Sequence, residues 1–149
     1  MLSEDIKGEY EISIFKKFLA ASKLPIIELS VKKCFPPEPD ILCEHKTEGV
    51  IAFELVEICD FNMAQSISNM NEKYLWTTDP TDSIITKKIK KTYITSYPVN
   101  LLCYVDGRVV TPDNIIVLKI KHLFSSEVHS FSRVWLLGKS GSSYDVWAA

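Results

Sequence analysis

The sequence is poor in glycine and proline, and it lacks long apolar runs. With 5 Gly and 7 Pro among 149 residues, its composition excludes a collagen-like or disordered chain. Strongly apolar runs, such as Val99 to Val105 around Asn100, are far shorter than the roughly 20 residues that cross a bilayer, so no membrane partner is expected. The polar, acidic N-terminus is unlike a signal peptide, which favours a cytoplasmic protein.

Cysteine pairs of the CxxC type and a strong charge excess are also missing. The four cysteines have irregular spacings, so a zinc site is not expected and the thiols should be reduced; they are Cys34, Cys43, Cys59 and Cys103. Seventeen Lys and Arg residues against nineteen Asp and Glu residues give a net charge of −2. This balance neither indicates nor excludes nucleic acid, because a local basic patch matters more than the sum.

The length, without repeats or linkers, predicts a single domain over residues 1–149. Helices are expected over 3–22, 62–75, 82–94 and 112–124, and strands over 26–33, 40–45, 50–58, 98–105, 131–137 and 143–148. Thr81 or Asp82 is the expected N-cap of the 82–94 helix. This order predicts an α/β fold in which helices flank a mixed central β-sheet.

Two acidic residues fall on the expected strands 40–45 and 50–58, which are joined by a turn containing Gly49 and so form a hairpin. Asp40 follows Pro39 where one strand opens, and Glu54 lies inside the next, otherwise apolar strand. If the two meet at the end of the sheet, they offer hard oxygen ligands of the kind that Mg²⁺ or Mn²⁺ takes. A metal would also compensate the cost of a carboxylate in an apolar strand. The alternatives are a turn cap at Asp40, a solvated Glu54, or ordinary ion pairs.

A third acidic residue faces inward on the first helix. At about 100° per residue, Glu11 falls between Phe15 and Phe18 on the apolar arc of the 3–22 helix. A glutamate in that position needs a partner. The alternatives are a metal ion as the partner, a salt bridge with a core lysine, or a helix register different from the one assumed.

The helix over 82–94 carries a run of lysines, of which one faces inward. Lys88 falls between Ile84 and Ile85 on the helical wheel, whereas Lys87 points away and Lys91 lies at the border. An inward ammonium can neutralise charge that develops on a phosphate. The alternative is a packed stem that carries its ammonium out to water.

The residues Pro39-Asp40 and Glu54-Leu55-Val56 resemble the motif of the PD-(D/E)xK nuclease superfamily. The order of elements over about residues 3–105 also fits, and Glu11 matches the glutamate that members typically add from the first helix. The resemblance implies a restriction-endonuclease-like fold and metal-dependent hydrolysis of phosphodiester bonds. Asp40, Glu54, the Leu55 carbonyl and Glu11 would then hold Mg²⁺ or Mn²⁺. Nucleic acid, with DNA favoured, is the implied partner, and a homodimer is allowed.

The sequence departs from that motif at the family's lysine, whose position is taken by Val56. Lys88 is the best replacement, and we expect its ammonium within about 7 Å of the Glu54 carboxylate, the range over which opposite charges act. Lys87 and Lys91 would contact backbone phosphates. Val56 favours the alternative of a catalytically inactive domain that binds nucleic acid or protein. A structural module held by ordinary ion pairs is the third hypothesis.

Overall fold

The computed structural model describes residues 3–60 and 79–149, and the helix expected over 62–75 lies outside these ranges. The described helices and strands, in chain order, are α1 (Ser3–Ser22), β1 (Ile26–Lys33), β2 (Ile41–His45), β3 (Gly49–Glu57), α3 (Thr81–Ile89), β4 (Val99–Tyr104), α4 (Asp113–Ser126), β5 (Arg133–Leu137) and β6 (Ser143–Ala148). Every strand expected from the sequence is present to within about two residues.

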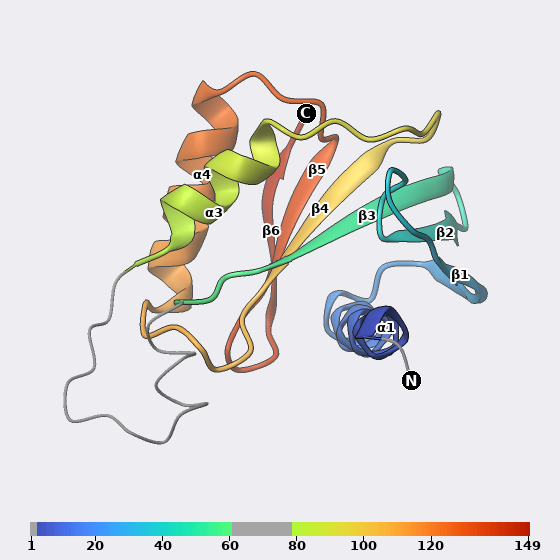
Figure 1. Cartoon of the computed structure of the whole chain (residues 1–149), viewed down its shortest axis with the longest axis horizontal. Helices are drawn as coiled ribbons and strands as arrows, with labels where there is room; N and C mark the ends of the chain where they lie inside the picture. Colours follow the sequence, from blue (N-terminus) through green and yellow to red (C-terminus); the bar gives the residue numbers. More distant parts are fainter. Residues whose placement is uncertain (1–2, 61–78) are drawn as a thin grey trace.

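The strands form one six-stranded sheet in the order β1-β2-β3-β4-β5-β6. The β1–β2, β2–β3 and β5–β6 pairs are antiparallel, whereas the β3–β4 and β4–β5 pairs are parallel. Helix α1 lies on one face, and α3 and α4 lie together on the other (Figure 1). The predicted α/β class with a mixed sheet flanked by helices is therefore confirmed.

Each face of the sheet carries its own apolar core, because alternate strand residues point to opposite faces. On the α1 face, Phe15 and Phe18 pack against Phe53 of β3. On the other face, Ile85 of α3 and Ile120 of α4 belong to a second buried cluster. The central strand β4 is buried along its whole length, as expected for a parallel strand covered on both faces.

The start and end of α3 differ from the prediction. The helix ends at Ile89, five residues before the expected position, and its N-cap is Pro80, whose ring makes no capping hydrogen bond. Asp79 takes over this role, because its carboxylate accepts hydrogen bonds from the Thr81 backbone N–H at 3.1 Å and the Thr81 hydroxyl at 2.6 Å. Neither Thr81 nor Asp82 is the N-cap.

Strand β1 is an edge strand interrupted by a bulge. Its pairing with β2 jumps from Ile27 to Lys32, so the alternation of the strand is broken between them. Leu29 in the bulge is fully exposed. The bulge leaves Lys33 beside Ile41, at the start of β2 and next to Asp40.

The helices in residues 3–60 and 79–149 fall short of the combined length and hydrophobicity that a bilayer-spanning segment needs. All four thiols are free, and Cys34, Cys43 and Cys103 are buried. Burial raises the pKa of the Cys43 thiol to about 12, which leaves it protonated and unreactive at neutral pH.

Candidate functional site

Asp40 lies just before β2 begins and completes the hydrogen bonding of β3. The pairing of the two strands ends at Ile41 and Phe53. The Leu55 N–H therefore lies past the end of β2 and has no backbone partner on that strand. The Asp40 carboxylate accepts a hydrogen bond from that N–H at 2.9 Å. Because the N–H and C=O of one strand residue point to the same neighbouring strand, the Leu55 carbonyl also lies on the side of Asp40.

Glu54 lies on β3 with its side chain on the face covered by α3, and it is 6% exposed. Its Oε1 accepts a hydrogen bond from the Asp40 backbone N–H at 3.1 Å. Its Oε2 lies 2.8 Å from Lys88 Nζ of α3 and accepts a hydrogen bond from the Tyr93 hydroxyl at 3.0 Å. The expected approach of Lys88 to Glu54 is confirmed. Tyr93 comes after α3 and was not among the predicted site residues.

Glu11 is 5% exposed on α1, which agrees with its inward angle on the helical wheel. Its partner is a lysine that the sequence analysis missed. Lys33 Nζ, at the end of β1, lies 2.9 Å from Glu11 Oε1 and 3.4 Å from Asp40 Oδ1. Glu11 is thus joined to Asp40 through Lys33, in the manner of the salt-bridge alternative. The missed signal was the pairing of strand 26–33 with Ile41, which brings Lys33 next to Asp40.

Five charged residues form one chain of contacts from α1 to α3, in which the link between Asp40 and Glu54 is the Asp40 backbone N–H. The order is Glu11, Lys33, Asp40, Glu54 and Lys88. Three carboxylates and two ammonium groups leave one excess negative charge when all are ionised. A partly buried cluster with such an excess attracts a cation.

The pKa values of the two glutamates are raised mainly by burial, with a further contribution from the negative charge of Asp40. Burial raises the pKa of the Glu54 carboxyl and the negative charge of Asp40 raises it further, against the opposing effect of Lys88. Burial likewise raises the pKa of Glu11, which Lys33 opposes. Although burial lowers it, the pKa of Lys33 is raised overall by Glu11 and Asp40. The two lysines do not fully offset the cost of burying the two glutamates.

The raised pKa of Glu54 predicts that the metal-free protein loses stability as the pH rises above 4.5, the ordinary value for a glutamate. Above that value the unfolded chain releases its proton first, so the folded state binds more protons and the free energy of unfolding falls. We expect Glu54→Gln to show a shallower decrease than the wild type in urea unfolding between pH 4.5 and neutrality. The exposed Glu44→Gln should retain the wild-type slope, and an equal slope in Glu54→Gln would contradict the prediction.

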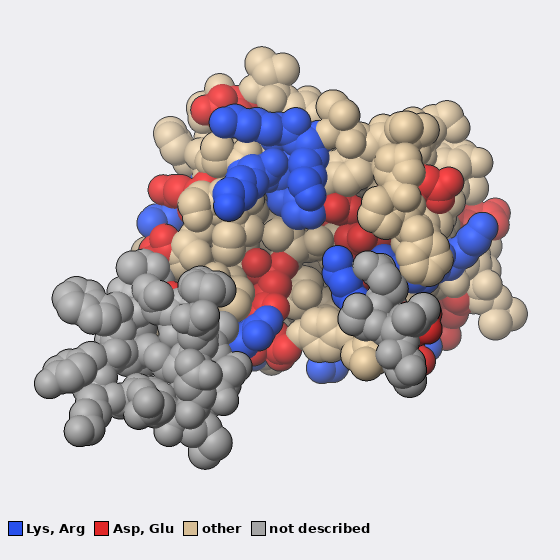
Figure 2. All heavy atoms as spheres, in the orientation of Figure 1, with Lys and Arg blue, Asp and Glu red and all other residues tan. Residues whose placement is uncertain are grey.

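The other predicted site residues lie around this cluster. Val56 is half-buried, packs against the core under α3 and α4, and provides no charge. Lys87 and Lys91 are exposed, in contrast to Lys88. Lysine and arginine side chains gather over the region where α3 ends (Figure 2). Phe35 adds an exposed aromatic ring, whose centroid lies 6.0 Å from Lys33 Nζ.

Metal coordination by three acidic side chains is not preformed. Within the described ranges, no three His, Cys, Asp or Glu side chains are grouped so that they could hold an ion. Asp40 and Glu54 adjoin, whereas Glu11 is held on the far side of Lys33. Two carboxylates still suit Mg²⁺, which commonly takes one or two from the protein and completes its shell with water and substrate phosphate.

Comparisons of the chain with known protein families, curated proteins and solved structures do not assign a function to it. The chain matches no family model, no curated protein and no solved structure.

Proposed function

We propose that the protein is a metal-dependent nuclease that hydrolyses phosphodiester bonds of nucleic acid, with DNA as the favoured substrate. The observation that carries the proposal is the 2.8 Å contact between Lys88 and Glu54. Val56 leaves the motif without its lysine, and α3 brings an ammonium to the same carboxylate. The order α1-β1-β2-β3, followed by α3 and a β4 strand parallel to β3, supports a restriction-endonuclease-like core.

The donor atoms beside Lys88 fit a hard divalent cation. Asp40 and Glu54 would hold Mg²⁺ or Mn²⁺ together with the Leu55 carbonyl, which lies on the side of Asp40. Glu11 would act indirectly, by holding Lys33 against Asp40. When bound, such a cation polarises a phosphate and lowers the pKa of water.

The side chains supply the remaining functions. Lys88 balances negative charge at the reacting phosphate, since it is held within the site by Glu54 and is 16% exposed. Tyr93 keeps the Glu54 carboxylate oriented through its hydrogen bond to Oε2. Lys87 and Lys91, both exposed, contact backbone phosphates of the bound strand without reading its sequence.

A catalytically inactive module that binds nucleic acid or protein is the second candidate. It is favoured by Lys33 and Lys88, which already neutralise most of the carboxylate charge. In that case the cluster would hold α1, the hairpin and α3 together, and it would bind no metal.

Isothermal titration with Mn²⁺ and a cleavage assay separate the two candidates. The wild-type protein is expected to bind Mn²⁺ and to cut labelled single-stranded or double-stranded DNA or RNA, with loss of cleavage in EDTA. Absence of heat on Mn²⁺ addition together with absence of cleavage on all four substrates would overturn the nuclease proposal.

A further inference from the structure

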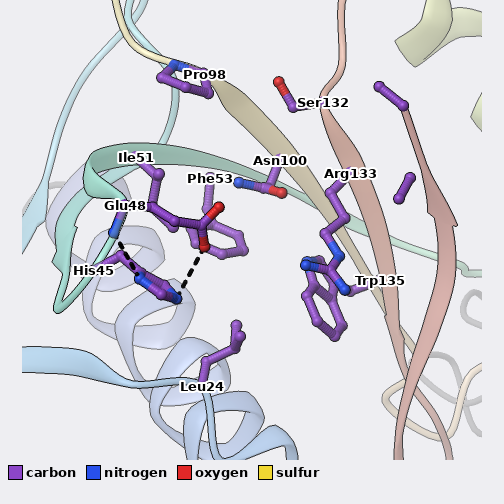
Figure 3. A pocket seen from close by; sticks show the side chains of 12 residues that line it. Leu24, His45, Glu48, Ile51, Phe53, Pro98, Asn100, Ser132, Arg133 and Trp135 are labelled. Atoms are coloured by element: carbon purple, nitrogen blue, oxygen red, sulfur yellow. Dashed lines mark hydrogen bonds and ion pairs between the residues drawn. The ribbon is translucent and has the colours of Figure 1, made fainter.

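A cavity of about 290 Å³ opens at the end of the sheet where β3, β4 and β5 begin, on the α1 face (Figure 3). Helix α1 ends at Ser22 and therefore does not cover these first strand residues. Leu24, Ile51 and Phe53 supply apolar walls, and Arg133 and Trp135 stand opposite them. The cavity faces away from Glu54, since Glu54 and its neighbour Phe53 point to opposite faces of the sheet.

The register of the sheet brings a polar side chain into the centre of this cavity. Phe53 pairs with Asn100, and Asn100 pairs with Arg133, so the three lie side by side on one face. Asn100 is 6% exposed on the central strand. Its carboxamide is directed between Glu48 and Arg133 (Figure 3).

The Asn100 carboxamide makes no side-chain hydrogen bond with residues 3–60 or 79–149. The residue as a whole is buried, but its amide reaches into the open cavity, so its donor and its acceptor are both free to bind a ligand there. Trp135 also lines the cavity, and its indole N–H is enclosed by protein and has no hydrogen-bond partner in the described part of the chain. The Asn100 amide is thus left open to a ligand in the cavity.

The ionisable side chains around Asn100 are paired within the protein. His45 Nδ1 accepts hydrogen bonds from the backbone N–H groups of Thr47 and Glu48, so its proton lies on Nε2, 3.0 Å from the Glu48 carboxylate. Arg133 pairs with Asp145 through two nitrogens. The turn and the ion pair explain these residues without a ligand, but they do not explain Asn100.

We propose that this cavity binds an adenine base. A carboxamide offers one donor and one acceptor side by side, the pattern with which asparagine pairs with the N6 and N7 atoms of adenine. Arg133 lies over the Trp135 ring at 4.6 Å and is partly exposed, so the opposite face of its guanidinium can stack on a flat heterocycle. The volume suits a single base and excludes a folded chain. The site is separate from the carboxylate cluster and does not rest on the nuclease proposal.

The test is a titration of isotope-labelled protein with adenosine, followed by NMR at the Asn100 side-chain amide and the Trp135 indole N–H. We expect saturable shifts of both signals. Asn100→Leu should weaken adenosine binding about 10-fold to 100-fold, since it removes one bidentate pair.

Two controls make the outcome specific. Asn114→Leu, an exposed change on α4 at the other face of the sheet, should leave adenosine binding unchanged. A single-stranded oligodeoxyadenylate distinguishes the source of the base: shifts with both probes indicate a free nucleoside site, and shifts with the oligonucleotide alone indicate a base within a nucleic acid strand. Absence of saturable shifts with either probe, or equal binding by Asn100→Leu, would overturn the inference. Neither readout depends on cleavage.

Discussion

Replacing Lys88 with alanine is expected to lower the rate of phosphodiester hydrolysis by about 10²–10³, the usual loss for one charge-stabilising donor. Its ammonium is held 2.8 Å from Glu54 Oε2, and Val56 offers no cation on the same strand face. Single-turnover cleavage of a labelled oligonucleotide at saturating metal measures the loss. The effect should fall on the rate of the chemical step rather than on substrate affinity.

The exposed neighbour Lys87 provides the matched control for this change. Lys87→Ala should leave the rate almost unchanged and reduce the salt dependence of binding by roughly one unit of slope. Because alanine also removes the packed stem of Lys88, Lys88→Met serves as a second variant that keeps apolar volume without charge. Equal rates for the Lys87 and Lys88 variants would show that α3 does not supply the missing lysine.

Asp40→Asn is expected to reduce Mn²⁺ binding and to lower cleavage about 10³-fold or more, because metal polarisation of the phosphate supplies several kcal/mol. The substitution removes charge and keeps shape. The asparagine oxygen can still accept the hydrogen bond from the Leu55 N–H, so the fold should persist. Calorimetry with Mn²⁺ and the cleavage assay give independent measurements.

The same variant provides a readout that does not need activity. The charge of Asp40 contributes to the raised pKa of Glu54, so its removal should move that pKa downward. NMR titration of the Glu54 carboxyl carbon in metal-free buffer measures the change. The exposed Asp82→Asn on α3 should alter neither Mn²⁺ binding nor this pKa. Unchanged Mn²⁺ affinity in Asp40→Asn would remove Asp40 from the metal site.

Helical periodicity was sufficient to orient the two charged helix residues of the cluster. Glu11 and Lys88 lie among apolar neighbours three and four residues away, and both are turned inward in the structure. This prediction needs only the angle between successive helix residues, which is a local property of the backbone. The two strands of the hairpin were predictable from another local signal, the turn containing Gly49 that joins them.

The identity of each ion-pair partner was not predictable in this way. Lys33 reaches both Glu11 and Asp40 because a bulge in β1 and antiparallel pairing with β2 set its position beside Ile41. Tyr93 reaches Glu54 from the segment after α3, which ends earlier than its sequence pattern suggested. None of these contacts falls at a helix or strand period, and the contact of Tyr93 with Glu54 joins residues that are distant along the chain.

The sequence by itself therefore determined the α/β class, the strands and the inward direction of Glu11 and Lys88. The tertiary structure alone decided that α1 and α3 cover opposite faces of the sheet, so that Glu11 meets Lys33 and Lys88 meets Glu54. It also decided that Asn100 of the buried strand β4 faces a cavity, because α1 ends at Ser22 and does not cover this part of the sheet. The physical reason is that the side of a helix on which a residue lies follows from local backbone geometry. The ion-pair partner of that residue depends on sheet register and helix packing, which join distant parts of the chain.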